Sequence, residues 1–413
     1  MELPPPNYDE ARVPPYRLPE LLRTESGAVV DSAQAWREHR RPELLELFRR
    51  HVYGRFDADV EIEVTRVVTD AMACGGAAVR SELDVGIRAP GKRSNAATVQ
   101  VLVFEPARGA GPFPAFLGLN LYGNQTVHPD PALRLAAGWL PEKDEVGLLG
   151  NVATEASRGM HAARFPIEQL VARGYALVTA YVGDIDPDFA DGFENGVHAL
   201  LSPAARAASD APGTIAAWAF GLSRIFDALA EHPRIDRERV VVFGHSRLGK
   251  AALWTAAEDP RFALAISNES GCGGAALSRR DFGERLLHLN QRFPHWFCPA
   301  FHAFNGRETE LPVDQHQLLA LLAPRPVYVG SAAADLWADP HGELLACRAA
   351  APAYELFGLR GVQTTPASFD LPHIGYHCRP GRHDITPRDF WHYLEFADRH
   401  LGRASPETAT RPT

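Results

Sequence analysis

The pattern of hydrophobic and polar positions changes character at about residue 113. Before it, three runs alternate between apolar and polar residues, which is typical of antiparallel strands that expose one face to water; they cover 60–68, 77–87 and 98–104. After it, continuous apolar runs alternate with helical periodicity; the runs are 113–119, 176–181, 240–243, 262–267 and 327–331. The stretches with helical periodicity are 42–52, 212–231, 247–258 and 387–401. Alternation of this kind predicts βαβ units and a parallel sheet covered by helices.

The connections between these elements suggest the domain organisation and where a ligand binds. Residues 1–33 are rich in proline and polar residues and predict an extended arm. We expect one α/β domain over 34–403 and a tail over 404–413. Two segments, 121–168 and 271–322, are too long and irregular to be simple connections, and such segments are usually lids or binding surfaces. We therefore expect the substrate to bind there.

The most informative stretch covers residues 240–250 and reads VVVFGHSRLGK. Its four apolar residues suit a buried strand, the run stops at Gly244, and helical periodicity opens directly after Ser246. A serine at a sharp turn from strand to helix has its hydroxyl raised above the sheet, as in a nucleophile elbow. The spacing departs from the usual G-x-S-x-G because the second glycine, Gly249, comes one residue late. On spacing alone, a turn without chemistry stays an open alternative.

A serine hydroxyl is a poor nucleophile unless a histidine accepts its proton and an acid orients that histidine. His383 lies in the loop-like RPGRHDIT ahead of the last helical stretch, so it is the candidate base, with His373 and His377 as surface or supporting residues. Two acids, Glu269 and Asp335, each follow a predicted strand, where their side chains can reach the carboxyl edge of the sheet. Either acid could orient the histidine. The alternative for each is a solvated loop carboxylate or a helix cap.

Composition narrows the classes of function. The 413 residues are 46% hydrophobic and 23% charged, as in an ordinary soluble globular protein. A net charge of -9 argues against nucleic acid or a membrane surface as a partner. No apolar stretch approaches the roughly 18 residues of a membrane span. The start, MELPPPNYDE, lacks the basic and apolar regions of a signal peptide.

Neither a disulfide framework nor a metal site is predicted, and we expect no cofactor. The five cysteines are scattered without a C-x-x-C pair, and we expect most of them to be buried. His373 and His377 are four residues apart, but Gly375 between them disfavours the helix that a metal site of this spacing needs. Three aspartates in GDIDPDF lack the glycine and glutamate of a calcium loop, so we expect them to cap helices and shape a pocket wall; they are Asp184, Asp186 and Asp188.

Long, specific motifs surround the candidate serine, acids and histidine. They read GHSRLGKAALWTAAEDPRFALAISNESGCGGAALSRR, VGDIDPDF, PVDQHQLLALLAPRPVYVGSAAADLWADP and GRHDIT. In these motifs the chain resembles the bacterial branch of the glucuronoyl esterases, a family of carbohydrate esterases, over about residues 7–401. The resemblance implies an α/β-hydrolase fold. We therefore expect a mostly parallel central sheet in an αβα sandwich, with N-terminal antiparallel strands and lid-like insertions.

The resemblance also implies catalytic roles, residue by residue. Ser246 matches the nucleophile and His383 the general base. Glu269 matches the acid after the sixth strand of many members, and Asp335 matches the acid after the seventh strand of others. Arg247 matches an arginine that supports the oxyanion, with its backbone N–H at the helix start as a further donor. The alternative for Arg247 is a structural salt bridge.

Other residues match the family's sugar contacts, and one pair departs from its pattern. Lys250, Glu284 and Trp337 match residues that contact the uronic acid sugar, although a lone tryptophan is more often simply packed. The loop 120–123 is a weaker candidate for another oxyanion donor. Fungal relatives carry a cysteine beside the serine, bonded to one beside the histidine, whereas this chain has His245 and Arg382 there. We therefore expect packing alone to position the serine and the histidine.

The expected function is hydrolysis of esters that join 4-O-methyl-D-glucuronic acid of xylan to lignin alcohols, through an acyl-enzyme on Ser246. One alternative is an acetyl xylan esterase or another carbohydrate deacetylase, which keeps the triad but does not need Arg247 or Lys250 at a uronate. Another is a non-catalytic carbohydrate-binding protein on the same fold, which would need a damaged triad. The resemblance implies glucuronoxylan and lignin-carbohydrate esters as partners and a secreted or periplasmic location. We expect a monomer.

Overall fold

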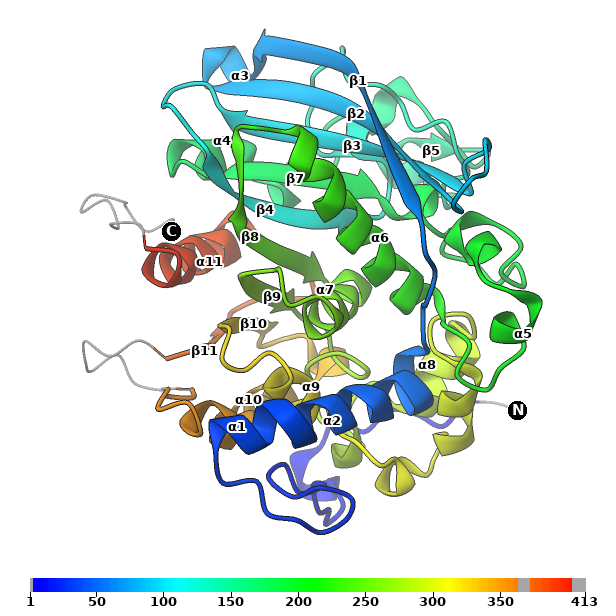
Figure 1. The fold of residues 1–413 in the computed structure, drawn as a ribbon, viewed down its shortest axis with the longest axis vertical. Coiled ribbons are helices and arrows are strands. Elements are labelled where there is room, and N and C mark those ends of the chain that lie inside the picture. The colour runs from blue at the N-terminus through cyan, green and yellow to red at the C-terminus, as the bar shows by residue number, and fades with distance from the viewer. Residues whose placement is uncertain (1–2, 363–371, 403–413) are drawn as a thin grey trace.

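The computed structural model describes residues 3–362 and 372–402 and contains a nine-stranded sheet in the order β1-β2-β3-β7-β4-β8-β9-β10-β11 (Figure 1). The first four strands in this order pair antiparallel; they are β1 (Glu61–Met72), β2 (Ala78–Arg88), β3 (Ala97–Pro106) and β7 (Ala176–Tyr181). From β7 onward all neighbours are parallel, through β4 (Phe113–Asn120), β8 (Ile235–His245), β9 (Leu264–Asn268), β10 (Val327–Ala332) and β11 (Ile374–Arg379). The predicted mixed sheet is confirmed.

The register of the parallel strands brings their carboxyl ends to one edge. His245 at the end of β8 is opposite Asn268 at the end of β9, and Asn268 is in turn opposite Gly330 of β10. Ala332 of β10 pairs with Arg379 of β11. Residues that follow these strands therefore emerge side by side.

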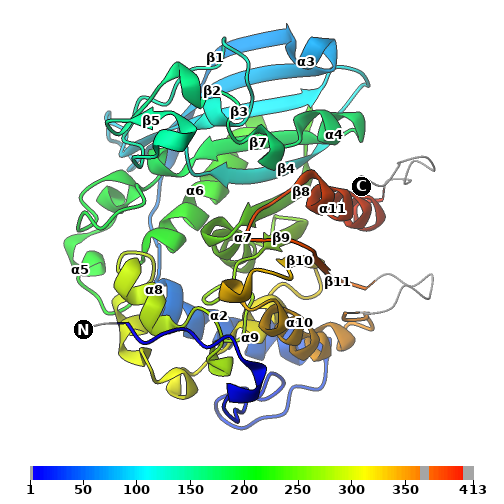
Figure 2. The same cartoon turned by 180° about the vertical axis from the view of Figure 1, so that it is seen from behind.

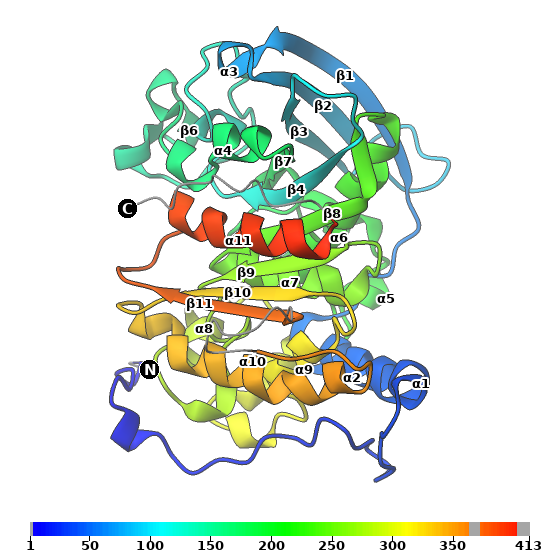
Figure 3. The same ribbon diagram turned by 90° about the vertical axis from the view of Figure 1, so that its left-hand side faces the viewer.

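Helices cover both faces of the sheet (Figure 3). The residues of β4, β7, β9 and β10 are all buried, as expected for strands that are apolar on both faces. One face packs against α2 (Arg41–Phe48), α6 (Thr214–Ala228), α7 (Arg247–Glu258), α9 (Gln315–Ala320) and α10 (Pro340–Glu355). The other face packs against α4 (Ile167–Ala172) and α11 (Pro387–His400). These layers form the expected αβα sandwich.

The remaining α-helices and β-strands are short and lie, along the chain, before or between the elements already named. They are α1 (Ala33–Ala35), α3 (Ala73–Gly76), β5 (Leu148–Leu149), β6 (Val152–Ala153), α5 (Pro203–Arg206) and α8 (Leu286–Arg292). Helix α1 continues into α2 through a π-helical stretch, and a second such stretch, Arg49–Tyr53, follows α2. The helix predicted at 42–52 is confirmed within this longer one.

The prediction that the first strands expose one face to water holds for β1 alone. There Glu61, Glu63 and Thr65 are exposed, whereas β2 and β3 are mostly buried. The segment 121–168 contacts both of these strands: Arg134 pairs with Glu82 and Asp84 of β2 at 3.1 and 2.8 Å, and Asn124 donates to the Gln100 carbonyl of β3 at 2.7 Å. Ion pairs with a distant segment cannot be read from the alternation of a strand.

The N-terminal arm runs in an extended path past α8 and α10 (Figure 2, dark blue). Leu21 and Val30 are buried, and Arg40 of the first helix donates to the carbonyl of Glu20 at 2.7 Å. The division into arm, catalytic domain and tail stays a prediction, and the tail at 404–413 lies outside the described residues. No helix among the described residues combines the length and hydropathy needed to cross a membrane.

Candidate active site

Ser246 occupies a strained turn between β8 and α7. Strand β8 ends at His245 and α7 begins at Arg247, which leaves Ser246 with φ 59° and ψ −127°. A non-glycine residue in this region costs about 1–3 kcal/mol, so the surrounding structure must hold it there. The Ser246 amide does so in part by donating to the carbonyl of Asn268 at 2.8 Å. This is the strand-turn-helix geometry of a nucleophile elbow.

The late glycine of the motif has a packing reason. A Cβ at Gly249 would lie 3.0 Å from both the Ser267 hydroxyl oxygen and the Ser270 Cβ. Glycine at this position therefore lets α7 approach the end of β9 closely. Leu248 takes the place of the usual second glycine and is buried.

His383 follows β11 and meets both candidate acids. Its Nδ1 lies 2.6 Å from Asp335 Oδ2 and 3.3 Å from Glu269 Oε2. His377 instead binds Asp389 at 2.8 Å and stacks on His392. The structure thus brings His383, rather than its upstream neighbour, to the edge of the sheet where Ser246 lies.

The two acids are not equivalent. Glu269 accepts from Arg379 Nη2 at 2.6 Å and from the Asp384 amide at 3.1 Å, whereas Asp335 is the nearer acid to His383. Burial raises the pKa of Glu269 to about 7, although His383 and Arg379 oppose this. Burial lowers the pKa of His383, but its hydrogen bonds to Asp335 and Glu269 outweigh burial and raise it to about 9. The geometry favours Asp335 as the acid that orients the histidine.

The expectation that packing alone positions the serine and the histidine is wrong. Besides Glu269, Arg379 donates to the carbonyls of Arg382 and Asp384 at 3.0 and 2.5 Å, so it holds the loop on both sides of His383. His245 is bonded to Asn268 Oδ1 at 2.6 Å, and its ring centroid lies 4.5 Å from that of His383. Hydrogen bonds and a ring contact therefore stand where fungal relatives have a disulfide.

Ser246 and His383 open into one cavity of about 330 Å³. Its described lining comes from α7, from the ends of β9 to β11 and from the predicted binding segment 271–322; the residues are Ser246, Arg247, Lys250, Glu269, Ser270, Gly271, Glu284, Arg292, Phe293, Trp296, Asp335, Trp337, Ala338 and His383. All eight predicted site residues are among them. The other segment, 121–168, instead lines a small neighbouring cavity with Tyr122, His161 and Phe165 beside His245.

One wall of the cavity is built around Arg247. Its guanidinium forms an ion pair with Asp188 and lies 4.6 Å above the ring of Trp296. Asp188 also accepts from Trp296 Nε1 at 2.8 Å and from His295 Nε2 at 3.0 Å. The salt bridge considered for Arg247 thus exists, and it holds the guanidinium at the cavity.

The helix-capping role expected for the three aspartates of GDIDPDF is wrong. Asp184 accepts from the Gln100 amide at 3.0 Å, and Asp186 accepts from the Thr214 hydroxyl at 2.7 Å. Only Asp188 reaches the cavity wall, through Arg247. The sequence shows three aspartates at alternate positions but does not show which group each side chain contacts.

Lys250, Glu284 and Trp337 form a second part of the cavity wall. Lys250 is 3% exposed, donates to the Ser270 carbonyl at 2.5 Å and lies 3.8 Å from Glu284 Oε2. Burial lowers the pKa of Lys250 and raises that of Glu284, and each partner opposes the other's shift. The Glu284 amide donates to the Trp337 carbonyl at 2.9 Å, and the Trp337 ring stays partly exposed. The wall combines a polar pair with a flat apolar face, a combination suited to a sugar.

Comparison with known proteins places this geometry in a family. The family model "Glucuronyl esterase, fungi" matches residues 207–358. Carbohydrate esterase MZ0003, from an unknown prokaryotic organism, is 46% identical over 405 residues, 96% of this chain and 92% of that protein. The solved glucuronoyl esterase from Solibacter usitatus is 41% identical with a TM-score of 0.86, over 95% of this chain and 100% of that one. The chain belongs to the glucuronoyl esterase family.

The predicted resemblance and the α/β-hydrolase fold are therefore confirmed. A fungal member, 4-O-methyl-glucuronoyl methylesterase 1 of Sodiomyces alcalophilus, is 41% identical over 126 residues, 28% of this chain and 25% of that protein. Sequence likeness to this fungal protein is thus local, whereas sequence likeness to the bacterial esterases covers almost the whole chain.

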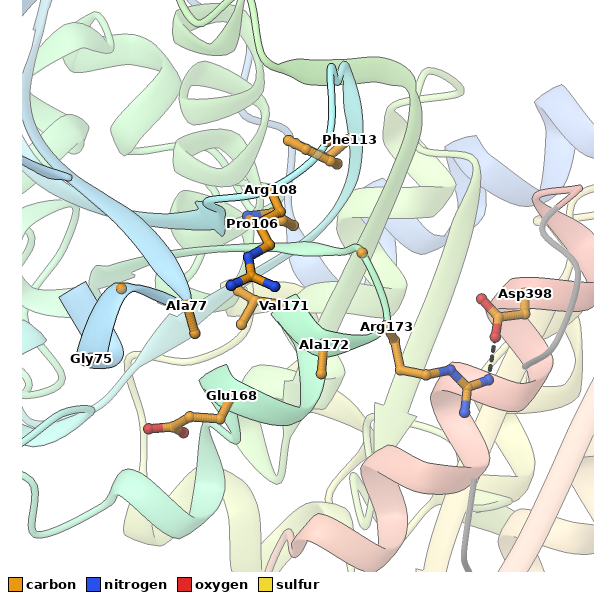
Figure 4. A pocket seen from close by; sticks show the side chains of 13 residues that line it. Gly75, Ala77, Pro106, Arg108, Phe113, Glu168, Val171, Ala172, Arg173 and Asp398 are labelled. Carbon is orange, nitrogen blue, oxygen red and sulfur yellow. Dashed lines mark hydrogen bonds and ion pairs between the residues drawn. The ribbon is translucent and has the colours of Figure 1, made fainter. Parts of the chain in front are cut away.

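A larger cavity, of about 650 Å³, lies at the other edge of the esterase sheet (Figure 4). Its lining includes Phe113 at the start of β4 and Gly174 just before β7, together with Arg108, Glu168 and Arg173. Arg173 points toward Asp398, with which it forms an ion pair. No serine, cysteine or histidine is among its described lining residues, so size alone does not mark the active site.

Two groups of described residues bring three possible metal ligands within 4.8 Å of one another. In the group of Cys74, His128 and Glu168, His128 Nδ1 accepts the Asp130 amide at 3.2 Å, which leaves the ring proton on Nε2, the atom that faces Cys74. A protonated nitrogen cannot bind a metal. The other group is His383 with its two acids, where Nδ1–H is directed at the carboxylates. Neither arrangement favours a metal ion.

Glu343 of α10 is a buried acid that no motif of the sequence indicates. It accepts from the Gly271 amide at 3.0 Å and from the Ser331 hydroxyl at 2.5 Å. These partners belong to the loop after β9 and to β10, the elements from which Glu269 and Asp335 emerge. Burial raises the pKa of Glu343 to about 8. It therefore joins the two acid-bearing segments as a largely protonated group at neutral pH.

We expect Glu343→Gln to flatten the pH dependence of stability. Between pH 5 and 8 the folded protein holds a proton on Glu343 that the unfolded chain has lost, so the free energy of unfolding falls as the pH rises. One such proton corresponds to a slope of about 1.4 kcal/mol per pH unit, and glutamine removes it. Urea unfolding at several pH values measures the slope. Glu355→Gln, exposed on the same helix, is the matched control, and an equal slope in wild type and Glu343→Gln would contradict the role.

Proposed function

We propose that this protein is a serine esterase that hydrolyses the ester between 4-O-methyl-D-glucuronic acid of xylan and a lignin alcohol. The observation that carries the proposal is a single cavity whose lining contains Ser246 and the His383–Asp335 pair together with the Lys250–Glu284 pair and Trp337. The names of the bacterial and fungal relatives support the substrate class. Because that substrate is a plant cell-wall polymer, we also propose a secreted or periplasmic location.

The proposed reaction begins with proton transfer from Ser246 to His383. The serine oxygen attacks the ester carbonyl, and the resulting oxyanion lies at the start of α7, where the Arg247 N–H has no acceptor within the helix. The Arg247 guanidinium adds positive charge nearby. His383 then protonates the departing alcohol, which leaves an acyl-enzyme. Water, activated by the same histidine, attacks the acyl group and releases the acid and Ser246.

The sugar wall accounts for selectivity in this proposal. In the ester the uronate carboxyl carries no charge, so recognition depends on the hydroxyls and on the ring face. Lys250 offers donors and Glu284 offers acceptors to hydroxyls, and the Trp337 ring offers a surface for the sugar's C–H groups. An acetyl group on xylan would use none of these contacts.

Replacing Lys250 by methionine is expected to lower kcat/KM for the benzyl ester of glucuronic acid by about 10- to 100-fold. The change removes a charged hydrogen-bond donor, worth about 1.5–3 kcal/mol, and keeps the volume of the side chain. The assay compares this ester with acetylated xylan, for wild type and variant. Lys92→Met, on an exposed loop, is the matched control and should leave both activities unchanged.

The same assay separates the proposal from its alternatives. Serine-dependent release of acetate from xylan, little cleavage of the glucuronate ester and no effect of Lys250→Met would identify a carbohydrate deacetylase. No hydrolysis of either substrate, with binding of xylan intact, would identify a non-catalytic binding protein.

A further inference from the structure

The first residues of the chain lie against the sugar wall. We call residues 3–12 the N-terminal strap. The Gly283 amide donates to the Asn7 carbonyl at 2.8 Å, and the next residue, Glu284, lines the cavity. On its other side Gly283 is pressed against Leu336, whose carbonyl oxygen would lie 2.5 Å from a Cβ at Gly283. The strap therefore packs against the loop that carries Glu284, and that loop packs against the loop that carries Trp337.

Both ends of the strap are anchored to this wall. At one end the Pro4 carbonyl pairs with His288 Nε2 at 2.8 Å, and the His288 ring lies 5.4 Å from that of Trp337. At the other end Glu10 pairs with Arg280 at 2.7 Å and with His341 at 3.0 Å. The strap therefore joins the loop before Glu284 to the start of α10. These contacts hold it in a fixed position, unlike a terminus without anchors.

Between these anchors Tyr8 is held at the rim of the cavity. The residue is 46% exposed, and its ring packs edge-on against buried Phe282 with centroids 6.3 Å apart. Burial raises the pKa of the Tyr8 hydroxyl, and the charges of Asp335 and Glu284 raise it further. The residue before Tyr8, Asn7, accepts from the Gly283 amide directly before Glu284, so Tyr8 lies next to the cavity lining. A fixed, half-exposed aromatic ring at a cavity rim is suited to stacking on a sugar.

The size of the cavity decides which sugar would reach Tyr8. About 330 Å³ is at the lower end of the range for small-ligand pockets, so the uronic acid occupies the cavity and the xylan main chain stays outside. The main-chain sugar that carries the uronic acid must therefore lie at the rim. Tyr8 offers an exposed aromatic surface there that no step of the hydrolysis uses.

We propose that the N-terminal strap is the outer wall of the substrate-binding site and that Tyr8 stacks on the xylose to which the esterified uronic acid is attached. This inference rests on the proposed function and deepens it. It assigns the recognition of the polymer to the strap, while Lys250, Glu284 and Trp337 recognise the uronic acid.

Two substrates test the proposal because only one of them reaches the rim. The first is the benzyl ester of glucuronic acid, and the second is the same ester carried on a xylo-oligosaccharide. Tyr8→Ala should lower kcat/KM for the second by about tenfold and change it for the first by less than twofold. Tyr8→Phe, which keeps the ring, should behave like wild type on both. Arg17→Ala, an exposed residue of the arm beyond the strap, is the control for general effects of altering the arm.

The outcomes distinguish a failure of the inference about the strap from a failure of the proposed function. Equal losses on both substrates would overturn the proposal, because Tyr8 would then act by supporting the Glu284 wall. No loss on either would overturn it as well. If wild type hydrolyses neither ester, the proposed function fails and this inference with it. As an independent measure, calorimetry on inactive Ser246→Ala should show about tenfold weaker binding of the oligosaccharide ester after Tyr8→Ala is added.

Discussion

Replacement of Ser246 by alanine is expected to reduce kcat on the benzyl ester of glucuronic acid by about 10⁶-fold. The serine oxygen forms the bond to the acyl group, and no other hydroxyl among the described lining residues follows a strand-to-helix turn. Alanine tolerates positive φ no better than serine, so the strain at 59° stays and folding should be unchanged. Steady-state kinetics gives the loss, and thermal unfolding checks the fold.

Two further measurements make the test specific. A serine-directed phosphonylating reagent should add one label to wild type and none to Ser246→Ala, as read by intact mass. Ser202→Ala, at the exposed N-cap of the short helix α5, should keep both label and activity. Activity of Ser246→Ala above 1% of wild type, or a label that persists, would show that another group is the nucleophile.

The same strain predicts that two inactive variants differ in their free energy of unfolding. Glycine adopts positive φ without the cost that serine bears, so Ser246→Gly relieves the turn that Ser246→Ala retains. The free energy stored at this residue exists because the hydroxyl must stand above the sheet. Pattern alone indicates a turn here, but the strain is visible only in the backbone angles.

The sequence predicted the elements that carry a strong local signal. Continuous apolar runs gave the central strands, because a strand buried on both faces needs apolar residues at every position. Two of the elements that were missed show the physical reasons. Helix α10 is rich in alanine and contains Gly342 and Pro352, so it lacks a clear apolar stripe, and β11 is the short, partly polar IGYHCR. Both owe their structure to the sheet against which they pack.

The residues of the candidate site also divide into those that a local sequence pattern indicates and those that only the fold brings together. Ser246 and His383 were found because each stands at a recognisable place, a strand-to-helix turn and a loop before a capped helix. Arg379 was missed because it lies on β11, which was itself not predicted, and because its partners Glu269 and Asp384 are joined to it only by the fold. Tyr8 shows the limit most clearly. Nothing near it in the sequence indicates that Glu284, far along the chain, is its neighbour.

Asp335→Asn is expected to reduce kcat by about 10⁴-fold, and Glu269→Gln by far less. Asp335 Oδ2 is the nearer acceptor of the His383 Nδ1–H, at 2.6 Å against 3.3 Å for Glu269. An asparagine amide can turn its N–H₂ toward the ring and favour the tautomer with the proton on Nε2, which cannot accept the serine proton. Glu269 already serves Arg379 and the Asp384 amide, so its loss disturbs the support of the loop more than the tautomer.

The pH profile distinguishes the two acids by the size of the shift that each variant causes. A negative charge beside the imidazole stabilises its protonated form, so removing Asp335 lowers the pKa of His383 from about 9 and moves the acidic limb of kcat/KM to lower pH. Glu269, whose pKa is about 7, carries only part of a charge near neutrality, so Glu269→Gln should move the limb less. Asp384→Asn changes an acid adjacent to His383 and is the matched control. A larger loss and shift for Glu269→Gln than for Asp335→Asn would make Glu269 the acid that orients the histidine.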